Sequence, residues 1–372
     1  MITIKEVKTK ADIKKFVNLQ YKLYKGNKNW VPPIKKDEIK ALTDENPALS
    51  FCDAKFFLAY DDNGKIVGRV GAIINHKYNE KTGKKYVRIY KPEFYDNPEV
   101  FDALIQAVED FGKQNGMELI HGPLGFTNLD TQGLLIEGFE YIQSIASVYH
   151  LPYYKDHFDR LGFRKENDWI EFRITLTEEP IKKAMRGVAI LKKRYGFTVK
   201  NFNSRKELAK YANEVFNILN DAFSELPYVA PFDDKTRDYY INKYFSILNP
   251  NFVKIVLKGE ELVGFIIGLP SLSEAMQKAN GSLYPFGIFP IIKALKHPKV
   301  VDLLLTGVKH KYQNTGAAVL LWAELQNYLW ERKIYTLETT GIFETNHNVI
   351  ANWKNFKNIQ HKRRRCYVKE IS

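Results

Sequence analysis

The chain has 372 residues, 56 Lys and Arg against 43 Asp and Glu, and a net charge of +13. Its hydrophobic content of 45% is too high for a disordered chain, and at about 150 residues per domain its length predicts two domains. The excess positive charge predicts an anionic partner: a nucleic acid, a membrane surface or a phosphorylated cofactor.

Several classes of protein are not supported by the sequence. No stretch approaches the ~18 uninterrupted apolar residues of a membrane span. The first residues, MITIKEVKTKADIKKF, lack the apolar centre of a signal peptide, so we expect a cytoplasmic location. Cys52 and Cys366 have no metal-binding spacing, and the eight histidines form no H-x-x-x-H or H-E-x-x-H motif. We therefore expect no catalytic metal.

Strands alternate with helices along the first half, which predicts a mixed α/β fold. The expected strands are at residues 2–7, 55–60, 65–75, 87–90, 118–121 and 169–176. The expected helices are at residues 11–23, 98–114 and 153–161.

The order of elements then starts again. The expected strands are at residues 197–202, 253–257, 261–269, 300–308, 334–340 and 364–371. The expected helices are at residues 206–223, 236–248, 317–331 and 346–356. A connecting helix with a basic face is expected between the halves.

The two halves also echo each other in sequence. GKIVG at 64–68 matches EELVG at 260–264, and each is followed, roughly 90 residues later, by an aromatic short helix, at 152–155 and 352–354. We predict a tandem duplication, with domains at 1–176 and 196–372 and a linker helix at 177–195. A chance match of short turns is the alternative.

The stretch VVDLLLTGVKHKYQNTGAAVLL, at 300–321, joins a strand to a helix through small residues. Such a loop exposes backbone N–H groups at the positive end of the helix, where a phosphate can approach closely. The alternative is an ordinary helix start capped by Asn314 or Thr315.

Within this stretch Gln313-x-x-Gly316-x-Ala318 resembles the acyl-CoA signature of the GNAT superfamily of N-acyltransferases. The resemblance implies two tandem GNAT-like folds, each an α/β unit with a mixed sheet, and acetyl-CoA or another acyl-CoA as co-substrate. It also implies pantetheine contacts from Thr306, Gly307 and Val308 and a next strand that splays away. The pyrophosphate would be held by the loop residues Gln313, Asn314, Thr315, Gly316, Ala317 and Ala318.

The resemblance also implies catalytic roles. The backbone N–H of Val308 would stabilise the oxyanion. Glu338 and Glu344 are the candidate bases, with a solvated or ion-paired carboxylate as the alternative for either. Asn346 matches the family's Asn at the start of a short helix. Trp353 falls where the family often has a tyrosine acid, and we carry it over as a cofactor-binding residue.

Further residues have weaker predictions. Tyr312 and Tyr367 are candidates to replace the missing acid, with packing as the alternative. An aromatic segment lines the acceptor pocket or packs a helix; its members are Tyr228, Phe232, Tyr239, Tyr240 and Tyr244.

The first half lacks the phosphate loop. Its equivalent position, 94–99, carries Asp96 and Glu99, whose charges repel phosphate, and Pro98, which lacks an N–H donor. We expect no acyl-CoA there. The long Gly-rich and aromatic loop at 121–139 is either a substrate lid or a structural loop.

We therefore predict an N-acyltransferase that moves an acetyl or longer acyl group from CoA to an amine on a small molecule or peptide. One alternative is a Fem-like transferase that uses aminoacyl-tRNA, which would suit the positive charge. The other is a CoA-binding protein without catalytic activity.

Overall fold

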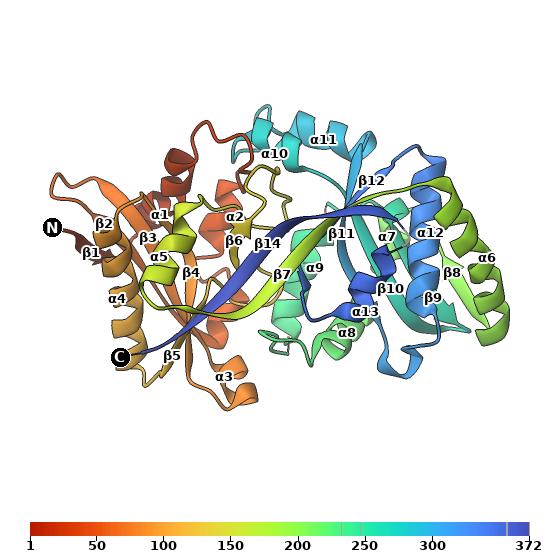
Figure 1. Cartoon of the computed structure of the whole chain (residues 1–372), viewed down its shortest axis with the longest axis horizontal. Helices are drawn as coiled ribbons and strands as arrows, with labels where there is room; N and C mark the ends of the chain where they lie inside the picture. Colours follow the sequence, from red (N-terminus) through yellow and green to blue (C-terminus); the bar gives the residue numbers. More distant parts are fainter. Residues whose placement is uncertain (232, 246, 355, 372) are drawn as a thin grey trace. The chain divides into compact units, whose positions relative to one another are not determined.

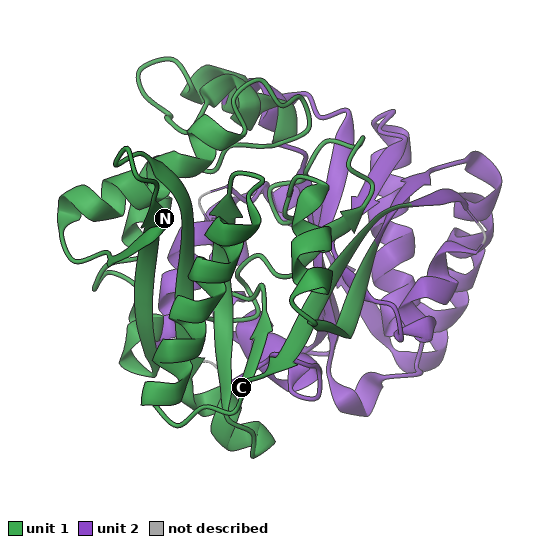
Figure 2. Ribbon diagram, turned by 60° about the vertical axis from the view of Figure 1, so that its left-hand side comes forward, with its two compact units in different colours: residues 1–170, 273–291, 361–372 green, residues 171–272, 292–360 purple. Residues whose placement is uncertain are grey.

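The computed structural model describes residues 1–231, 233–245, 247–354 and 356–371 (Figure 1). The chain divides into two compact units, which Figure 2 shows in different colours. Unit 1 contains Met1–Ile170, Ser273–Ile291 and His361–Ser372, and unit 2 contains Glu171–Leu272 and Ile292–Gln360. Both units are mixed α/β structures, which confirms the predicted fold class.

The sheet of unit 1 has the strand order β1-β2-β3-β4-β5-β14. Its strands are β1 (Thr3–Glu6), β2 (Cys52–Tyr60), β3 (Ile66–Asn75), β4 (Tyr86–Phe94), β5 (Leu119–Gly122) and β14 (Lys357–Glu370). The first four are antiparallel, β4 and β5 are parallel, and β14 runs antiparallel to β5.

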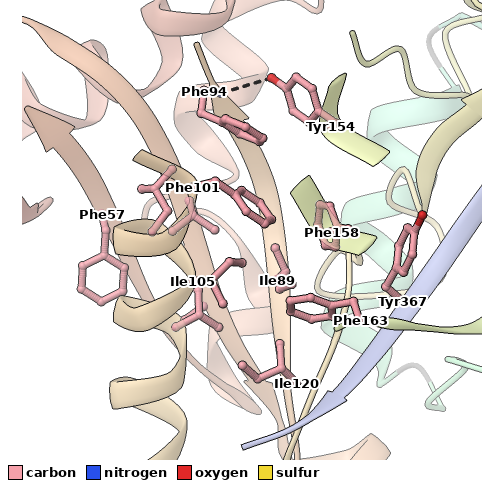
Figure 3. Packing of buried hydrophobic residues seen from close by; sticks show 14 of the residues in the cluster. Phe57, Ile89, Phe94, Phe101, Ile105, Ile120, Tyr154, Phe158, Phe163 and Tyr367 are labelled. Carbon is pink, nitrogen blue, oxygen red and sulfur yellow. Dashed lines mark hydrogen bonds between the residues drawn. The ribbon is translucent and has the colours of Figure 1, made fainter. Parts of the chain in front are cut away.

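The helices of unit 1 are α1 (Lys10–Leu23), α2 (Lys35–Lys40), α3 (His76–Thr82), α4 (Pro98–Gln114), α5 (Tyr153–Arg160) and α10 (Ser273–Ala279). Among them, α4 and α5 contribute buried side chains to an aromatic core. Figure 3 shows this core, in which the ring of Phe158 lies 5.0 Å from that of Phe101. The hydroxyl of Tyr154 accepts a hydrogen bond from the Phe94 N–H at 3.1 Å. The aromatic helix α5 is therefore part of the core.

The sheet of unit 2 has the strand order β7-β12-β11-β10-β9-β8. Its strands are β7 (Arg164–Thr175), which begins in unit 1, β8 (Phe197–Lys200), β9 (Val253–Lys258), β10 (Glu261–Pro270), β11 (Val300–Val308) and β12 (Thr336–Thr339). Its helices are α6 (Glu178–Tyr195), α7 (Arg205–Ala209), α8 (Ala212–Phe223), α9 (Asp234–Phe245), α12 (Ala317–Glu331) and α13 (His347–Ile350), while α11 (Ile288–Lys296) begins in unit 1.

Each sheet is completed by a strand from the other half of the sequence. In unit 1, β14 from the C-terminus pairs with β5. Leu119 lies opposite Glu370 at one end of this pairing, and Gly122 lies opposite Tyr367 at the other. In unit 2, β7 from the first half pairs with β12. The compact units are therefore not contiguous in sequence, and the boundaries 1–176, 177–195 and 196–372 stay a prediction about the duplicated repeat.

Some predicted elements differ from those observed. The helix expected at 206–223 is divided into α7 and α8, with Lys210 and Tyr211 in a turn between them. The helix expected at 346–356 is only α13 followed by a short 3-10 turn. The elements α2, α3, α10 and β6 (Leu134–Glu137) were not predicted; each is seven residues or shorter, too short for a periodic pattern.

Within the described ranges, no helix has the length and apolar character that crossing a membrane requires.

Candidate active site

In unit 2, the parallel pairing of β11 with β12 stops halfway along β11. Val300 lies opposite Thr336 at the start of the pairing, and Leu303 lies opposite Thr339 at its end. At the same level the register with β10 shifts, since Ile267 lies opposite Leu305 and Gly268 opposite Leu303. Leu304 is thus the extra residue of a β-bulge, which bends a strand and changes the direction of its later residues. This agrees with the splayed strands that the resemblance implied.

Beyond the bulge, β11 presents backbone groups away from β10. The Lys309 N–H donates to the Val263 carbonyl at 3.0 Å, and hydrogen-bonded positions alternate along an antiparallel pair. The N–H and C=O groups of Thr306 and Val308 therefore point to the side of β11 opposite β10. An extended ligand can pair with this edge as another strand would.

The loop after β11 leads directly into helix α12. Asn314 and Gly316 both have left-handed backbone angles, with φ of +65° and +82°. Gly316 is the N-cap residue, and no side chain of the described residues caps this helix. The expectation that Asn314 or Thr315 is the cap is therefore wrong; the Thr315 hydroxyl instead donates to the Tyr312 carbonyl at 2.6 Å. The first backbone N–H groups of α12, starting at Ala317 and Ala318, suit an anion.

Gly316 also lies against helix α6, which belongs to unit 2. A Cβ atom at this position would lie 2.7 Å from Cδ2 of Leu191 in α6, a distance too short for two carbon atoms. A second contact joins α6 to α12, an ion pair in which Lys192 Nζ lies 2.5 Å from Glu324 Oε1. Glycine thus suits the left-handed backbone angle of this position, and a larger residue would have to displace the Leu191 side chain.

Glu261, at the start of β10, binds three side chains of the turn at 309–312, which precedes the loop and which we call the basic turn. Its carboxylate accepts hydrogen bonds from Lys309 at 3.0 Å, from Lys311 at 3.0 Å and from the Tyr312 hydroxyl at 2.8 Å. These hydrogen bonds lower the pKa of Glu261 to about 2, and the bond from Lys311 has the largest effect. The same bond from the hydroxyl raises the pKa of Tyr312. Sequence reasoning missed Glu261, since it lies about 50 residues before its partners.

Glu338 is buried on β12 and bound to an arginine of β7. The guanidinium of Arg173 donates to Glu338 Oε1 from Nε at 2.8 Å and from a terminal nitrogen at 2.5 Å. Only 5% of Glu338 is exposed. The structure therefore agrees with the ion-paired alternative, although an ionised carboxylate held in this way can still accept a proton.

Asp302 is a second buried carboxylate, and it lies beside Glu338 in the β11–β12 register. A Cβ atom placed on Gly268 would lie 3.1 Å from the Val301 side chain and 3.5 Å from that of Leu325 in α12. The Val301 side chain, next to Asp302 in sequence, is therefore on the face of the sheet that α12 covers. Successive residues of a strand point to opposite faces. Asp302, Glu338 and Arg173 thus form a row on the face opposite α12, and sequence reasoning missed Asp302 and Arg173.

The other candidates on the C-terminal side of β12 have partners of their own. Glu344 is half-buried in the turn between β13 (Ile342–Phe343) and α13. Asn346 caps α13, its side-chain oxygen accepting the Val349 N–H at 3.3 Å. Trp353 is 2% exposed and packs edge-to-face on Trp322 of α12, with ring centroids 4.6 Å apart. The indole N–H of Trp353 has no acceptor among the residues that the structure describes.

The remaining aromatic candidates are packing residues in the structure. Tyr367 is buried in unit 1 and stacks on Phe158 at 4.9 Å. In unit 2, Tyr240 is buried and stacks on Tyr244 at 6.0 Å, while Tyr228 lies beside Phe343. Phe232, another member of the aromatic segment, lies outside the described residues.

In unit 1, residues 94–99 do not form a loop like that at 313–316 before α12 in unit 2. The Asn97 side chain caps α4 by accepting the Glu99 N–H at 2.9 Å, and the Asp96 carboxylate is bound to His157 at 2.8 Å. The long loop at 121–139 contains β6, which pairs with β14, and Phe126 packs on Tyr90. These contacts favour the structural interpretation of the loop; the absence of acyl-CoA from this half stays a prediction.

Three features of unit 2 fit an acyl-CoA. The edge of β11 past Leu304 offers backbone pairing to an extended arm. The start of α12, opened by Gly316, offers backbone donors to a phosphate group. Trp353 contributes a buried donor that lacks an acceptor among the described residues, and a buried polar group of this kind usually finds a partner.

No protein-family model matches the chain. Among curated proteins, it is 30% identical over 372 residues to the protein YghO of Escherichia coli, with 97% of this chain and 94% of that protein covered. It is 26% identical over 327 residues to the bacterial ceramide synthase of Caulobacter vibrioides, with 86% and 84% covered.

Solved structures show the same fold. A tandem GNAT protein from the clavulanic acid biosynthesis pathway matches with a TM-score of 0.57 at 11% identity, covering 100% of this chain and 99% of that one. A GNAT enzyme from Sphaerobacter thermophilus matches with a TM-score of 0.50 at 11% identity, covering 100% and 96%. The predicted tandem GNAT fold is thereby confirmed.

Proposed function

The chain belongs to the same protein family as YghO of Escherichia coli, and we propose from its tandem GNAT fold that it is an N-acyltransferase. The acyl group would pass from CoA, bound in unit 2, to an amine. The observation that carries this proposal is the open edge of β11 beyond Leu304, which leads directly to the uncapped start of α12.

The residues that would hold acyl-CoA are those of this edge and this loop. Thr306 and Val308 offer their backbone groups to the pantetheine arm, with Gly307 between them. The loop residues Gln313, Asn314, Thr315, Gly316, Ala317 and Ala318 surround the pyrophosphate. Bound acyl-CoA supplies a thioester, whose carbonyl carbon is open to attack by an amine.

The chain's own residues would perform three tasks in such a transfer. The Val308 N–H donates to the oxygen that becomes negative as the amine adds. Glu338, or Glu344 as the second candidate, accepts the proton that the attacking amine loses. The indole N–H of Trp353 would be the donor that stabilises negative charge on the departing sulfur without giving up its proton.

The substrate class is proposed from the ceramide synthase relative. A ceramide is the amide of a fatty acid with a long-chain amino alcohol, so its formation joins a fatty acyl group to an amine. We propose that this chain uses a long-chain acyl-CoA and an amine with a long hydrocarbon chain. Acetyl-CoA with a small-molecule or peptide amine is the alternative within the same reaction.

The test is calorimetric titration of the protein with acetyl-CoA and with palmitoyl-CoA. Binding should be lost when Gly316→Glu places a negative side chain in the loop. Gly259→Glu is the matched control, because Gly259 also has a positive φ, of +60°, but lies in the β9–β10 turn with no atoms around its Cβ position. Absence of CoA binding to the unmodified protein would refute the proposal.

Catalysis is tested by measuring thiol release from the acyl-CoA in the presence of amines. A panel containing sphinganine, an amino acid and a short peptide distinguishes the substrate classes. CoA binding without thiol release would favour the non-catalytic alternative. Salt-sensitive tRNA binding without CoA affinity would favour the Fem-like alternative.

A further inference from the structure

Four large hydrophobic side chains are exposed along one short segment. Tyr284, Phe286, Phe289 and Ile292 are exposed by 77, 75, 62 and 42% of their surface. They lie in the loop between α10 and α11 and in α11 itself (Figure 1). Single exposed apolar residues are ordinary, but a group of them marks a surface that a partner covers.

The loop that carries these side chains is held by hydrogen bonds within unit 1. The Lys35 N–H donates to the Gly281 carbonyl at 2.9 Å, and the Ile288 N–H donates to the Leu283 carbonyl at 2.7 Å. The Ser282 hydroxyl donates to the Tyr284 carbonyl at 2.9 Å. Ile291 is buried and anchors α11. The aromatic rings therefore project outward from a fixed backbone.

Helical spacing continues the exposed surface along α11. Phe289, Ile292, Lys293 and Lys296 follow one another at i, i+3, i+4 and i+7, which places them on one face. All four are exposed. This face is therefore apolar at its start and basic at its end.

The charged side chains of the segment itself have one sign. Between Glu274 and Asp302 the sequence has no acidic residue, whereas it has four lysines, Lys278, Lys293, Lys296 and Lys299. Aromatic rings next to lysines, with no acidic side chain between them, are typical of segments that lie in the interface of an anionic bilayer.

We propose that residues 282–299, which we call the aromatic-basic segment, bind the chain to the surface of an anionic membrane. Tyr284, Phe286, Phe289 and Ile292 insert among the acyl chains near the headgroups, and the lysines contact lipid phosphates. A second copy of this chain is the poorer occupant, because a symmetric contact places the same positive charges opposite each other. The proposal rests on these exposed side chains and not on the proposed acyl transfer.

The test is co-sedimentation of the full chain with lipid vesicles, without any acyl-CoA. Two preparations are compared, one of phosphatidylcholine alone and one of equimolar phosphatidylcholine and phosphatidylglycerol. We expect binding to the anionic vesicles that weakens with added salt. The double variant Phe286→Ser/Phe289→Ser should lower vesicle affinity at least about tenfold, because it removes two large apolar side chains from the bilayer interface.

Three further variants make the result specific. Lys293→Glu/Lys296→Glu should abolish the preference for anionic vesicles. Ile190→Ser, which removes a side chain exposed by 66% on α6, is the apolar control and should bind like the unmodified protein. Lys10→Glu/Lys14→Glu, on α1, is the matched charge control, because it changes net charge equally at another exposed site.

Three outcomes would overturn the proposal. The first is no binding of the unmodified protein to either preparation. The second is an equal loss of binding in the aromatic variant and in the Ile190→Ser control. The third is a protein that is dimeric in solution, binds no vesicles and becomes monomeric in the aromatic variant. Circular dichroism is to check that each variant is folded, which we expect because the substituted side chains are exposed.

Discussion

Glu338 of β12 accepts two hydrogen bonds from one guanidinium, that of Arg173 on β7. The two residues are 165 positions apart in sequence, and they meet because a strand from the first half completes the sheet of the second. The carboxylate that the sequence offers as a base is therefore held by a cation that the first half provides.

The first prediction concerns this pair. Arg173→Met should destabilise the protein by about 2 kcal/mol, because it leaves a buried carboxylate without its cation. Glu338→Gln keeps the shape of the side chain and should cost less stability while it abolishes activity if Glu338 is the base. Urea unfolding and thiol release measure the two effects. Full activity in Glu338→Gln would exclude Glu338 as the base and leave Glu344 as the candidate.

The second prediction concerns Gly316 and Leu191. Gly316→Ala should weaken CoA binding, because alanine resists a φ of +82° and its Cβ meets Leu191. Adding Leu191→Ala removes the contact but not the backbone strain, so the double variant should recover part of the affinity. Calorimetry measures both. If Gly316→Ala binds CoA like the unmodified protein, the loop does not hold the pyrophosphate in this conformation.

The third prediction concerns Trp353. Trp353→Phe keeps a ring against Trp322 but removes the N–H donor, and it should lower kcat about tenfold with little change in CoA affinity. Trp322→Phe is the matched control, since it changes the other ring of the same edge-to-face pair. Equal effects of the two variants on kcat would mean that Trp353 has only a packing role.

The fourth prediction is a dependence of stability on pH through His150. Burial lowers the pKa of His150 to about 3, and its ring nitrogen Nδ1 accepts the Leu135 N–H at 3.1 Å. In the unfolded chain a histidine protonates near pH 6.5. As pH falls below about 6.5, His150 binds a proton in the unfolded state but not in the folded state. The free energy of unfolding therefore decreases.

Between about pH 7 and pH 5 this one residue should reduce the free energy of unfolding by about 2 kcal/mol. His150→Asn keeps an acceptor for Leu135 and removes the titration. Urea unfolding at both pH values should therefore show a smaller loss for the variant. An identical loss in both proteins would mean that His150 is protonated in the folded state.

Local patterns predicted the regular elements and the signature loop. The strands at 253–257, 261–269 and 300–308 and the helix at 317–331 result from hydrophobic alternation and helical periodicity, which depend only on neighbouring residues. The sequence is also compatible with the positive φ of Gly316 at the start of α12, since glycine accepts any backbone angle that the turn needs. Helices such as α10 were missed, because seven residues give no clear period.

The sequence by itself determined the tandem α/β architecture and the position of the loop between β11 and α12. Both follow from the periodicity and the short motifs of residues that are neighbours in the chain. Only the tertiary structure decided which strand completes each sheet, and with it that Arg173 meets Glu338 and that Tyr367 packs in unit 1. It also decided that Glu261 binds the basic turn and that Leu191 abuts Gly316. Pairing between distant strands and helices depends on side chains far apart in the chain, and a local pattern contains no information about them.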